Sequence, residues 1–479
     1  MISPKKLRKK YPQFIYQDYF YWISNNDLEI FFDFRACPEL GRRISFKPKV
    51  VIKNIKKSRL KKIKIEVLDN LIFNLGLVEL ISYWKATCSP KIEIEAGFLN
   101  KEQIGWWKDL ITNGMGQFFY ENKIDFRSPN FLHLQPKLTE NSSLPISVGS
   151  RTPAIFKRRL ENKVLVPVGG GKDSIVTLET LKKAKKNISC FSLNPTNAIK
   201  EVMKMAGCKK VIIERKIDPK LLQLNRKSFL NGHTPFSAYL AFLSVLTAVI
   251  FDHKYIAFSN ERSSNEGNLK YLGKEINHQY SKTFHFEKNF RKYSQKYLAK
   301  NVEYFSFLRP LYEIQISKLF SRHKKYFSVF LSCNEAHKTA SGLRKPTGKW
   351  CGKCPKCLFI FASLYPFVEA KKLITIFGQN LFDKKGLLAL MKELMGLKKF
   401  KPFECVGTKK ESQVAFYLSW KKAIRARAPG KLPYLLRYFE KNILPKNRNL
   451  ERESVKIMNS WSSQHKIPKG FKSLPLLTQ

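Results

Sequence analysis

The chain has 479 residues, of which 43% are hydrophobic and 13% aromatic. This composition excludes intrinsic disorder and leaves room for two to four domains. Lysine and arginine number 88 against 37 acidic residues, a formal net charge of +51. That balance favours a polyanionic partner, such as nucleic acid, an anionic membrane surface or a phosphorylated small molecule, but lysines scattered along the whole chain are equally explained by a lysine-rich composition.

Export and membrane signals are not recognisable in the sequence. Residues 1–13 are basic but no apolar run follows them, and the longest apolar stretch, Ala238–Phe251, is interrupted by Ser244 and Thr247. Nine cysteines in such a chain indicate a reducing compartment, with thiols or metal ligands rather than disulfides. We therefore expect a cytoplasmic protein without a membrane span.

Residues 1–150 predict an α+β domain. Short strands are expected at Lys49–Ile52, Ile63–Val67 and Lys91–Ile94, the last two from their alternation of polar and apolar residues. Helical spacing of apolar residues predicts helices at Leu71–Trp84 and Glu102–Tyr120.

Residues 151–367 predict a doubly wound, parallel α/β domain. It follows a Ser-, Pro- and Gly-rich stretch, Asn141–Pro153, that is typical of a linker. Continuous apolar strands alternate with helices here, which indicates a parallel sheet covered on both faces. The expected strands are Val164–Val168, Ile188–Leu193, Val211–Ile213, Lys254–Ser259 and Tyr326–Leu331, and the expected helices are Ser174–Lys185, Ala198–Ala206, Thr234–Phe251 and Pro310–Phe320. Residues 368–479 predict a basic helical region.

A glycine-rich loop, residues 168–174 (the phosphate loop), joins the first of these strands to a helix. It reads Val168-Gly169-Gly170-Gly171-Lys172-Asp173-Ser174. Three glycines allow the backbone N–H groups to surround an anion, and the following helix adds its positive N-terminal end. The loop does not match the Walker A motif, because Val166 stands at the position of its first glycine. It does not match the dinucleotide-binding fingerprint either, because Ser174 replaces the third glycine.

The phosphate loop resembles the Ser-Gly-Gly-x-Asp-Ser loop of the PP-loop ATP pyrophosphatases, with Gly169 in the leading serine position. The resemblance implies ATP, with the β- and γ-phosphates held as leaving pyrophosphate and the α-phosphorus open to attack. Asp173 is then expected to help hold Mg²⁺, and Asn194, after the second strand, to contribute to nucleotide binding. A structural glycine turn is the alternative.

A C-x₂-C-x₂-C motif lies near the end of this region. Cys351, Cys354 and Cys357, with Cys333 upstream, have the spacing of a tetrahedral, structural zinc site. An iron–sulfur cluster and unligated thiols are the alternatives.

A polar loop, residues 259–268, directly follows a predicted strand. In doubly wound sheets ligands bind at the carboxyl ends of strands, so this loop is expected to bind Mg²⁺ and a polar substrate. Its side chains are two carboxylates, a guanidinium and three amides: Asn260, Glu261, Arg262, Asn265, Glu266 and Asn268. A solvated loop is the alternative. His233, before a helix, is a candidate general base or a histidine without a role.

Several strings resemble one family, the UDP-N-acetylmuramoyl-L-alanyl-L-glutamate epimerases, or MurL family. They are Phe73–Leu80 with Tyr83–Lys85, Val166–Val168 with the phosphate loop, Ser259–Arg262, Asn265–Asn268, Trp350–Cys357 and Pro402–Thr408. The resemblance implies that ATP and Mg²⁺ drive inversion of the terminal L-glutamate of UDP-MurNAc-L-Ala-L-Glu, with release of AMP and pyrophosphate, in peptidoglycan precursor synthesis. It also implies a functional link to a MurD-like ligase that adds L-glutamate.

Roles for individual residues follow from this resemblance as expectations. The expected substrate-binding residues are Asn260, Arg262, Asn265, Glu266 and Arg309. The expected catalytic residues are Asp173 and Glu261, with Glu404, Cys405 and His233 as candidates for proton transfer. An RNA-modifying PP-loop enzyme and a non-catalytic nucleotide-binding scaffold are the alternatives. Nucleic acid is not favoured because no basic arm stands out, although the charge leaves it open.

Overall fold

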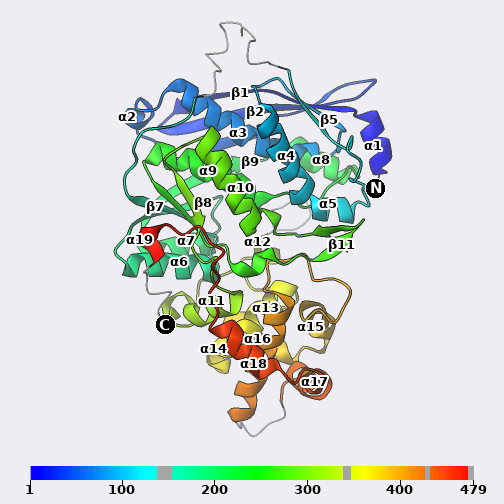
Figure 1. Cartoon of the computed structure of the whole chain (residues 1–479), viewed down its shortest axis with the longest axis vertical. Coiled ribbons are helices and arrows are strands. Elements are labelled where there is room, and N and C mark those ends of the chain that lie inside the picture. Colours follow the sequence, from blue (N-terminus) through cyan, green and yellow to red (C-terminus); the bar gives the residue numbers. More distant parts are fainter. Residues whose placement is uncertain (1, 138–153, 338–346, 427–431, 473–479) are drawn as a thin grey trace.

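One large mixed sheet runs through the computed structural model, which describes residues 2–137, 154–337, 347–426 and 432–472 (Figure 1). The sheet has eleven strands in the order β13-β10-β7-β8-β9-β4-β2-β1-β5-β6, and β3 pairs with β2. In that order the strands are β13 (Glu303–Ser306), β10 (Tyr255–Phe258), β7 (Lys163–Pro167), β8 (Asn187–Leu193), β9 (Lys209–Lys216), β4 (Lys49–Ile52), β2 (Asp27–Cys37), β1 (Gln13–Ser24), β5 (Lys91–Ile94), β6 (His133–Pro136) and β3 (Ile44–Phe46).

Five neighbouring strands, β9-β8-β7-β10-β13, are parallel. The chain builds outward from β7 in one direction through β8 and β9, and then in the other direction through β10 and β13. The reversal creates a topological switch point between β7 and β10, where ligands bind in open α/β sheets.

Helices cover both faces of these parallel strands. Val164 and Val166 of β7 enter one core with α6 (Lys172–Lys183) and α7 (Asn197–Ala206), whereas Leu165 enters the opposite core with α9 (Phe236–Phe251) and α10 (Phe284–Tyr297). Burial on both faces explains why β7 is continuously apolar. The expected mixed α/β architecture with a large, mostly parallel sheet is confirmed.

The N-terminal strands differ from the prediction. β1 and β2 form a long antiparallel hairpin that was not predicted. The predicted strand Ile63–Val67 is wrong, because α3 (Ile65–Trp84) already begins there and buries Val67, Leu68, Leu71 and Ile72 at helical spacing. The short alternation also fits the first turn of an amphipathic helix.

Other predicted bounds shift by a few residues. The helix predicted at Glu102–Tyr120 is divided at Met115 into α4 (Lys101–Gly114) and α5 (Gly116–Glu121). The expected linker Asn141–Pro153 lies outside the described residues, and the division into domains at residues 150 and 367 stays a prediction. Smaller elements complete this part of the chain: α1 (Pro4–Lys10), α2 (Lys57–Leu60), α8 (Pro219–Arg226), β11 (Leu269–Tyr271) and β12 (Lys274–Ile276).

The predicted strand Tyr326–Leu331 is also wrong. Tyr326 ends a 3₁₀ turn, and the segment that follows runs without strand pairing until the Leu331 N–H donates to the carbonyl of Gly170 at 2.9 Å. Phe327, Phe330 and Leu331 are apolar because this irregular segment is packed into the core. An apolar run alone does not distinguish a buried strand from a buried loop.

The last part of the chain is helical, as predicted, and its helices α13 to α18 gather at one end of the molecule (Figure 1). Its helices are α11 (Glu313–Phe320), α12 (Asn334–His337), α13 (Pro355–Leu364), α14 (Ala370–Phe377), α15 (Leu388–Leu394), α16 (Lys409–Arg425), α17 (Tyr434–Asn442), α18 (Leu450–Met458) and α19 (Lys469–Lys472). The last helix, α19, lies apart from the others, because its Phe471 packs against Tyr255 of β10 and Phe305 of β13. Across the described ranges, no helix is both long and apolar enough to cross a bilayer.

Candidate active site

The phosphate loop adopts a conformation that requires glycine. Gly170 has φ +77°, and a Cβ added there would lie 3.0 Å from Ile199. A Cβ on Gly171 would lie 3.0 Å from the side chain of Ser332, whereas a Cβ on Gly169 would meet no atom within 4 Å. Two glycines are therefore fixed by close packing, and the third leaves the loop open on its outer side.

The ends of the phosphate loop are anchored to the sheet and to α6. The buried Val168 donates its N–H to the carbonyl of Phe191 on β8 at 2.8 Å, and the Ser174 hydroxyl donates to the Gly171 carbonyl at 3.0 Å. Asn194, after β8, exchanges two hydrogen bonds of 2.9 Å with the backbone of Arg215 on β9. The amide of Asn194 thus ties two strands together at the edge where nucleotide binding was expected.

Lys172 is buried within the protein, although it was expected to contact phosphate. Its Nζ lies 2.5 Å from Asp173 Oδ1 and forms an ion pair with Glu313, and its side chain is 1% exposed. Burial disfavours the ammonium, but the two carboxylates outweigh burial and raise the pKa of Lys172. Lys172 therefore orients Asp173, whose carboxylate remains partly exposed at the start of α6.

The pKa values of two buried glutamates, Glu261 and Glu313, are shifted in opposite directions. Burial raises the pKa of Glu261 to about 7, the charges of Glu313 and Asp173 add to this effect, and Lys282 opposes it. Burial would also raise the pKa of Glu313, but Lys172 and Lys356 reverse that effect and lower it. Such a divergence between neighbouring carboxyls is typical of sites that move protons.

Two lysines that sequence reasoning missed join the motif at residues 402–408 to this cluster. The Lys282 Nζ donates to the Cys405 Sγ at 3.1 Å. Lys356, in the cysteine motif, donates to the Cys405 carbonyl, and its Nζ lies 3.7 Å from Glu313 Oε1. The structure therefore brings Asp173, Glu261 and Cys405 into one charged cluster. The available signal for Lys356 was its place between two cysteines of the predicted metal site.

The other predicted residues of this region are held by protein groups. Arg309 is fully buried, pairs with Glu287 at 3.2 Å, and donates to the Glu261 carbonyl at 2.6 Å and to the Ser264 hydroxyl at 2.9 Å. Arg309 thereby fixes the backbone of the polar loop.

The remaining polar-loop side chains point to different neighbours. Asn260 donates to the Ser306 hydroxyl at 3.2 Å, and Asn265 accepts the Phe284 N–H at the start of α10 at 2.8 Å. Arg262 lies over the ring of Tyr312 at 4.4 Å. Glu266 accepts the Lys409 N–H at 3.0 Å and pairs with the buried Lys401 at 3.3 Å.

His233 and Glu404 lie at the margins of the cluster. The ring centroids of His233 and His278 lie 4.4 Å apart. Burial, with the charges of His278 and Lys85 adding to it, holds the pKa of His233 well below its ordinary value. His233 is therefore neutral at pH 7. Glu404 accepts a hydrogen bond from the Asn334 side chain.

The four predicted cysteines, Cys333, Cys351, Cys354 and Cys357, converge into one group (the cysteine knuckle). Their Sγ atoms all lie within 4.8 Å of one another, with 3.9 Å between Cys333 and Cys354 and 3.7 Å between Cys351 and Cys357. A tetrahedral zinc with Zn–S bonds of about 2.3 Å implies sulfur–sulfur distances of about 3.8 Å. The group is a possible metal site, and its geometry is compatible with zinc.

Comparison with known proteins identifies the family. A model described as the MurL N-terminal domain matches residues 5–307, and one described as the MurL C-terminal domain matches residues 329–431. The chain belongs to the MurL family. The site of this MurL chain is shared between the two matched regions, because the first contributes the phosphate and polar loops and the second contributes Lys356 and Cys405.

Three MurL relatives are each named UDP-N-acetyl-alpha-D-muramoyl-L-alanyl-L-glutamate epimerase. The protein of Micromonospora sp. is 35% identical over 372 residues, which cover 76% of this chain and 79% of the relative. That of Xanthomonas oryzae pv. oryzae is 31% identical over 394 residues, which cover 82% of this chain and 83% of the relative. That of Salinispora tropica is 34% identical over 355 residues, covering 74% of each chain.

Proposed function

We propose that this chain is a PP-loop enzyme that inverts the terminal L-glutamate of UDP-MurNAc-L-Ala-L-Glu to D-glutamate, using ATP and Mg²⁺. The observation that carries the proposal is the convergence of the phosphate loop, the polar loop and Cys405 at the switch point, in a chain whose relatives are named as this epimerase. The reaction belongs to peptidoglycan precursor synthesis in the cytoplasm, and a MurD-like ligase that adds L-glutamate supplies the substrate.

Consumption of ATP makes chemical sense for this inversion. The proton on the α-carbon beside an ionised carboxylate is very weakly acidic, because its removal adds a second negative charge to the same group. Attack of a carboxylate oxygen on the α-phosphorus of ATP expels pyrophosphate and leaves an acyl adenylate without that charge. The carbanion is then delocalised as an enolate, which nearby donors stabilise. Reprotonation on the opposite face and hydrolysis release AMP and the inverted acid.

The phosphate loop fits the leaving pyrophosphate. The outer side at Gly169 is open, and the N-terminus of α6 directs N–H groups and its positive end toward an anion there. Asp173, with Glu261, would hold Mg²⁺, which would neutralise charge on the phosphate oxygens.

Cys405 is the proton-transfer candidate with the best support. Reactive cysteines lie in electropositive, partly exposed surroundings, and Cys405 is half-buried with the Lys282 ammonium 3.1 Å from its sulfur. Cys405 is therefore proposed to transfer the α-proton, with Lys282 hydrogen-bonded to its sulfur. Glu404 and His233 are the other candidates for the opposite face. The cysteine knuckle, holding zinc, has a structural role and places Lys356 against the Cys405 carbonyl.

The proposal is tested by incubating the enzyme with UDP-MurNAc-L-Ala-L-Glu, ATP and Mg²⁺ in D₂O. The expected products are AMP, pyrophosphate and a dipeptide nucleotide with deuterium at the α-carbon of D-glutamate. Release of ADP and orthophosphate instead would exclude the PP-loop chemistry. A dipeptide nucleotide that stays fully L-configured would exclude the epimerase.

A second candidate function is an RNA-modifying PP-loop enzyme that adenylates a base, which the net charge of +51 favours. Exchange of labelled pyrophosphate into ATP separates the two functions. Stimulation by the dipeptide nucleotide supports the epimerase, and stimulation by tRNA supports the RNA-modifying enzyme.

A further inference from the structure

The end of α3 carries a lysine that the chemistry above does not use. Lys85 directly follows α3 and is half-buried. Its Nζ donates to the Gly232 carbonyl at 2.9 Å. Within the part of the chain that the structure describes, no carboxylate forms an ion pair with this ammonium. Burial, with the charge of Arg215 adding to it, lowers the pKa of Lys85 to about 8, so the ammonium still predominates at pH 7.

Two lysines of the charged cluster, in contrast, are neutralised within the protein. Lys172 and Lys356 both form ion pairs with the buried Glu313. An ammonium that is half-buried without such a partner loses hydration and gains no ion pair in return, which is costly until an anion from outside the chain approaches it. Lys85 therefore has the properties of a subsite for an anionic group.

Two histidines lie next to Lys85, His233 and His278 (the histidine pair). The carbonyl that Lys85 contacts belongs to Gly232, which directly precedes His233. Both imidazoles are half-buried, and the His278 Nδ1 lies 2.5 Å from the Gln117 side-chain oxygen, which fixes its ring. Burial lowers the pKa of His278 to about 3, so both rings are neutral at pH 7. The histidine pair thus places polar groups beside the ammonium without adding negative charge.

The histidine pair is tied to the segment that carries Cys405. Asn268 accepts the His278 N–H at 2.8 Å and donates to the Pro402 carbonyl at 2.7 Å, in the same motif as Cys405. After burial, the charge of Lys282 is the next cause of the low pKa of His278, and Lys282 donates to the Cys405 Sγ at 3.1 Å. An anion held at the ammonium beside this pair would therefore lie next to the proposed proton-transfer residue.

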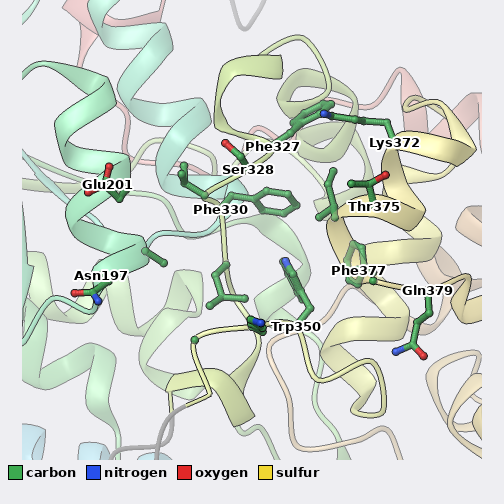
Figure 2. A pocket seen from close by; sticks show the side chains of 17 residues that line it. Asn197, Glu201, Phe327, Ser328, Phe330, Trp350, Lys372, Thr375, Phe377 and Gln379 are labelled. Carbon is green, nitrogen blue, oxygen red and sulfur yellow. The ribbon is translucent and has the colours of Figure 1, made fainter.

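A separate pocket of about 780 Å³ adjoins the phosphate loop (Figure 2). Its wall residue Leu331 donates to the Gly170 carbonyl at 2.9 Å. Its described lining residues come from the start of α7, the segment 327–331, residues 348–350 and α14 with the two residues that follow it, and they include neither Lys85 nor the histidine pair. A nucleotide held by the phosphate loop thus has a neighbouring pocket that does not involve Lys85, and the ammonium is available to the other anionic substrate.

We infer that Lys85 binds the side-chain carboxylate of the terminal glutamate, beside the histidine pair. The inference rests on the proposed function for the identity of the substrate. The α-carboxylate of that glutamate reacts with ATP, and the sugar, the lactyl group and alanine separate the diphosphate from the reacting carbon. The side-chain carboxylate is joined to that carbon by two methylene groups, so it lies close to Cys405 whenever the α-proton does. A charge-assisted hydrogen bond there selects glutamate over its uncharged amide.

Two substrates that differ only in this group test the inference. UDP-MurNAc-L-Ala-L-Gln matches UDP-MurNAc-L-Ala-L-Glu in size but has an amide in place of the side-chain carboxylate. Binding of each to the full chain is measured by calorimetry at pH 7 and fixed ionic strength. The parent protein should bind the glutamate form about tenfold or more tightly than the glutamine form. In Lys85→Met the ratio of the two Kd values should fall below about twofold, because no ammonium remains to distinguish them.

A lysine at the other end of α3 supplies the control. Lys64 directly precedes the helix and is exposed. Lys64→Met removes the same charge from the chain and should leave the ratio of the two Kd values unchanged. Lys85→Arg keeps the charge and should keep most of the ratio. If Lys85→Met does not fold, Lys85→Gln carries the same test, because its amide can still donate to the Gly232 carbonyl.

Equal weakening of both substrates in Lys85→Met would overturn the inference, since the ammonium would then serve the diphosphate or the fold. Weaker binding of free UDP in that variant would assign the ammonium to the diphosphate and overturn it as well. A ratio that stays at the parent value would show that Lys85 does not contact the side-chain carboxylate.

Activity separates this inference from the proposed function. Inversion by Lys85→Met that keeps the parent preference for the glutamate form, measured as the ratio of kcat/KM values, would remove Lys85 and keep the function. A preference in binding that depends on Lys85, in a protein that inverts neither form with ATP and Mg²⁺, would keep the subsite and remove the function.

Discussion

Replacing Lys356 by methionine tests whether the cysteine knuckle supports the reacting centre. The methionine fills the space of the lysine stem but removes its ammonium. Breaking a buried ion pair typically costs 3–5 kcal/mol, roughly, when one partner is left alone. Here Glu313 keeps Lys172, so the loss lies below that range, and the Cys405 carbonyl also loses a charge-assisted donor. We expect a loss of about 2–3 kcal/mol in the free energy of unfolding.

The chemical effect of this variant should be larger than its effect on stability. Loss of the hydrogen bond to the Cys405 carbonyl frees the segment that carries the thiol, and a displacement of about 1 Å can cost about 100-fold in rate. Deuterium incorporation into D-glutamate should therefore fall by about that factor, while pyrophosphate release falls less.

The neighbouring motif residue supplies the control. Lys353 lies in the same cysteine motif but is exposed, so Lys353→Met should stay within about 0.5 kcal/mol of the parent protein and keep its rate. Unfolding is followed in urea by tryptophan fluorescence, and the rate by mass spectrometry of the product. The reasoning is refuted if both methionine variants unfold at the same urea concentration and incorporate deuterium equally fast.

Three further predictions concern the phosphate loop, Glu261 and the cysteine knuckle. Asp173→Asn should abolish cleavage of ATP to AMP and pyrophosphate while the protein stays folded, and cleavage that persists, measured by chromatography, would contradict a role for Asp173 in the site. Burial, with the charges of Glu313 and Asp173, raises the pKa of Glu261 to about 7, so its contribution to stability is greatest below the ordinary value of 4.5 and is lost as the pH rises through 7. In Glu261→Gln, the free energy of unfolding measured in urea should fall less steeply as the pH rises through 7. The same pH dependence in the variant and the parent protein would contradict this role of Glu261. The protein should contain about one zinc per chain, and chelation or Cys354→Ser should lower its stability. Iron found by elemental analysis would contradict the zinc site and support an iron–sulfur cluster instead.

The parallel strands were predictable because burial on both faces of the sheet makes each of them a continuous apolar run. Val164–Val168 is apolar throughout because both faces of β7 are buried, and its helix follows directly after the glycines. The apolar segment Tyr326–Leu331 gave the same signal without forming a strand, since burial rather than pairing made it apolar. The β1–β2 hairpin was missed although its aromatic residues favour strands.

The site was predictable only in its local parts. Glycines, cysteines and the polar loop are contiguous motifs, so their positions could be read directly from the sequence. Glu313, Lys282 and Lys356 reach the cluster from three separate elements. The sequence around each of them does not indicate that these side chains come together in the fold. The burial of Lys172 was unforeseen for the same reason, because its partner Glu313 lies 141 positions away.

The antiparallel pairing of β4 with β9 has a consequence for synthesis of the chain. Lys49 meets Lys216 in this ladder, so β4 leaves the ribosome long before its partner strand exists. Until then its edge offers free N–H and C=O groups to any other extended segment, and such long-range pairing is slow to form. We expect nascent chains truncated before residue 209 to aggregate, because β4 lacks its partner strand β9 in them.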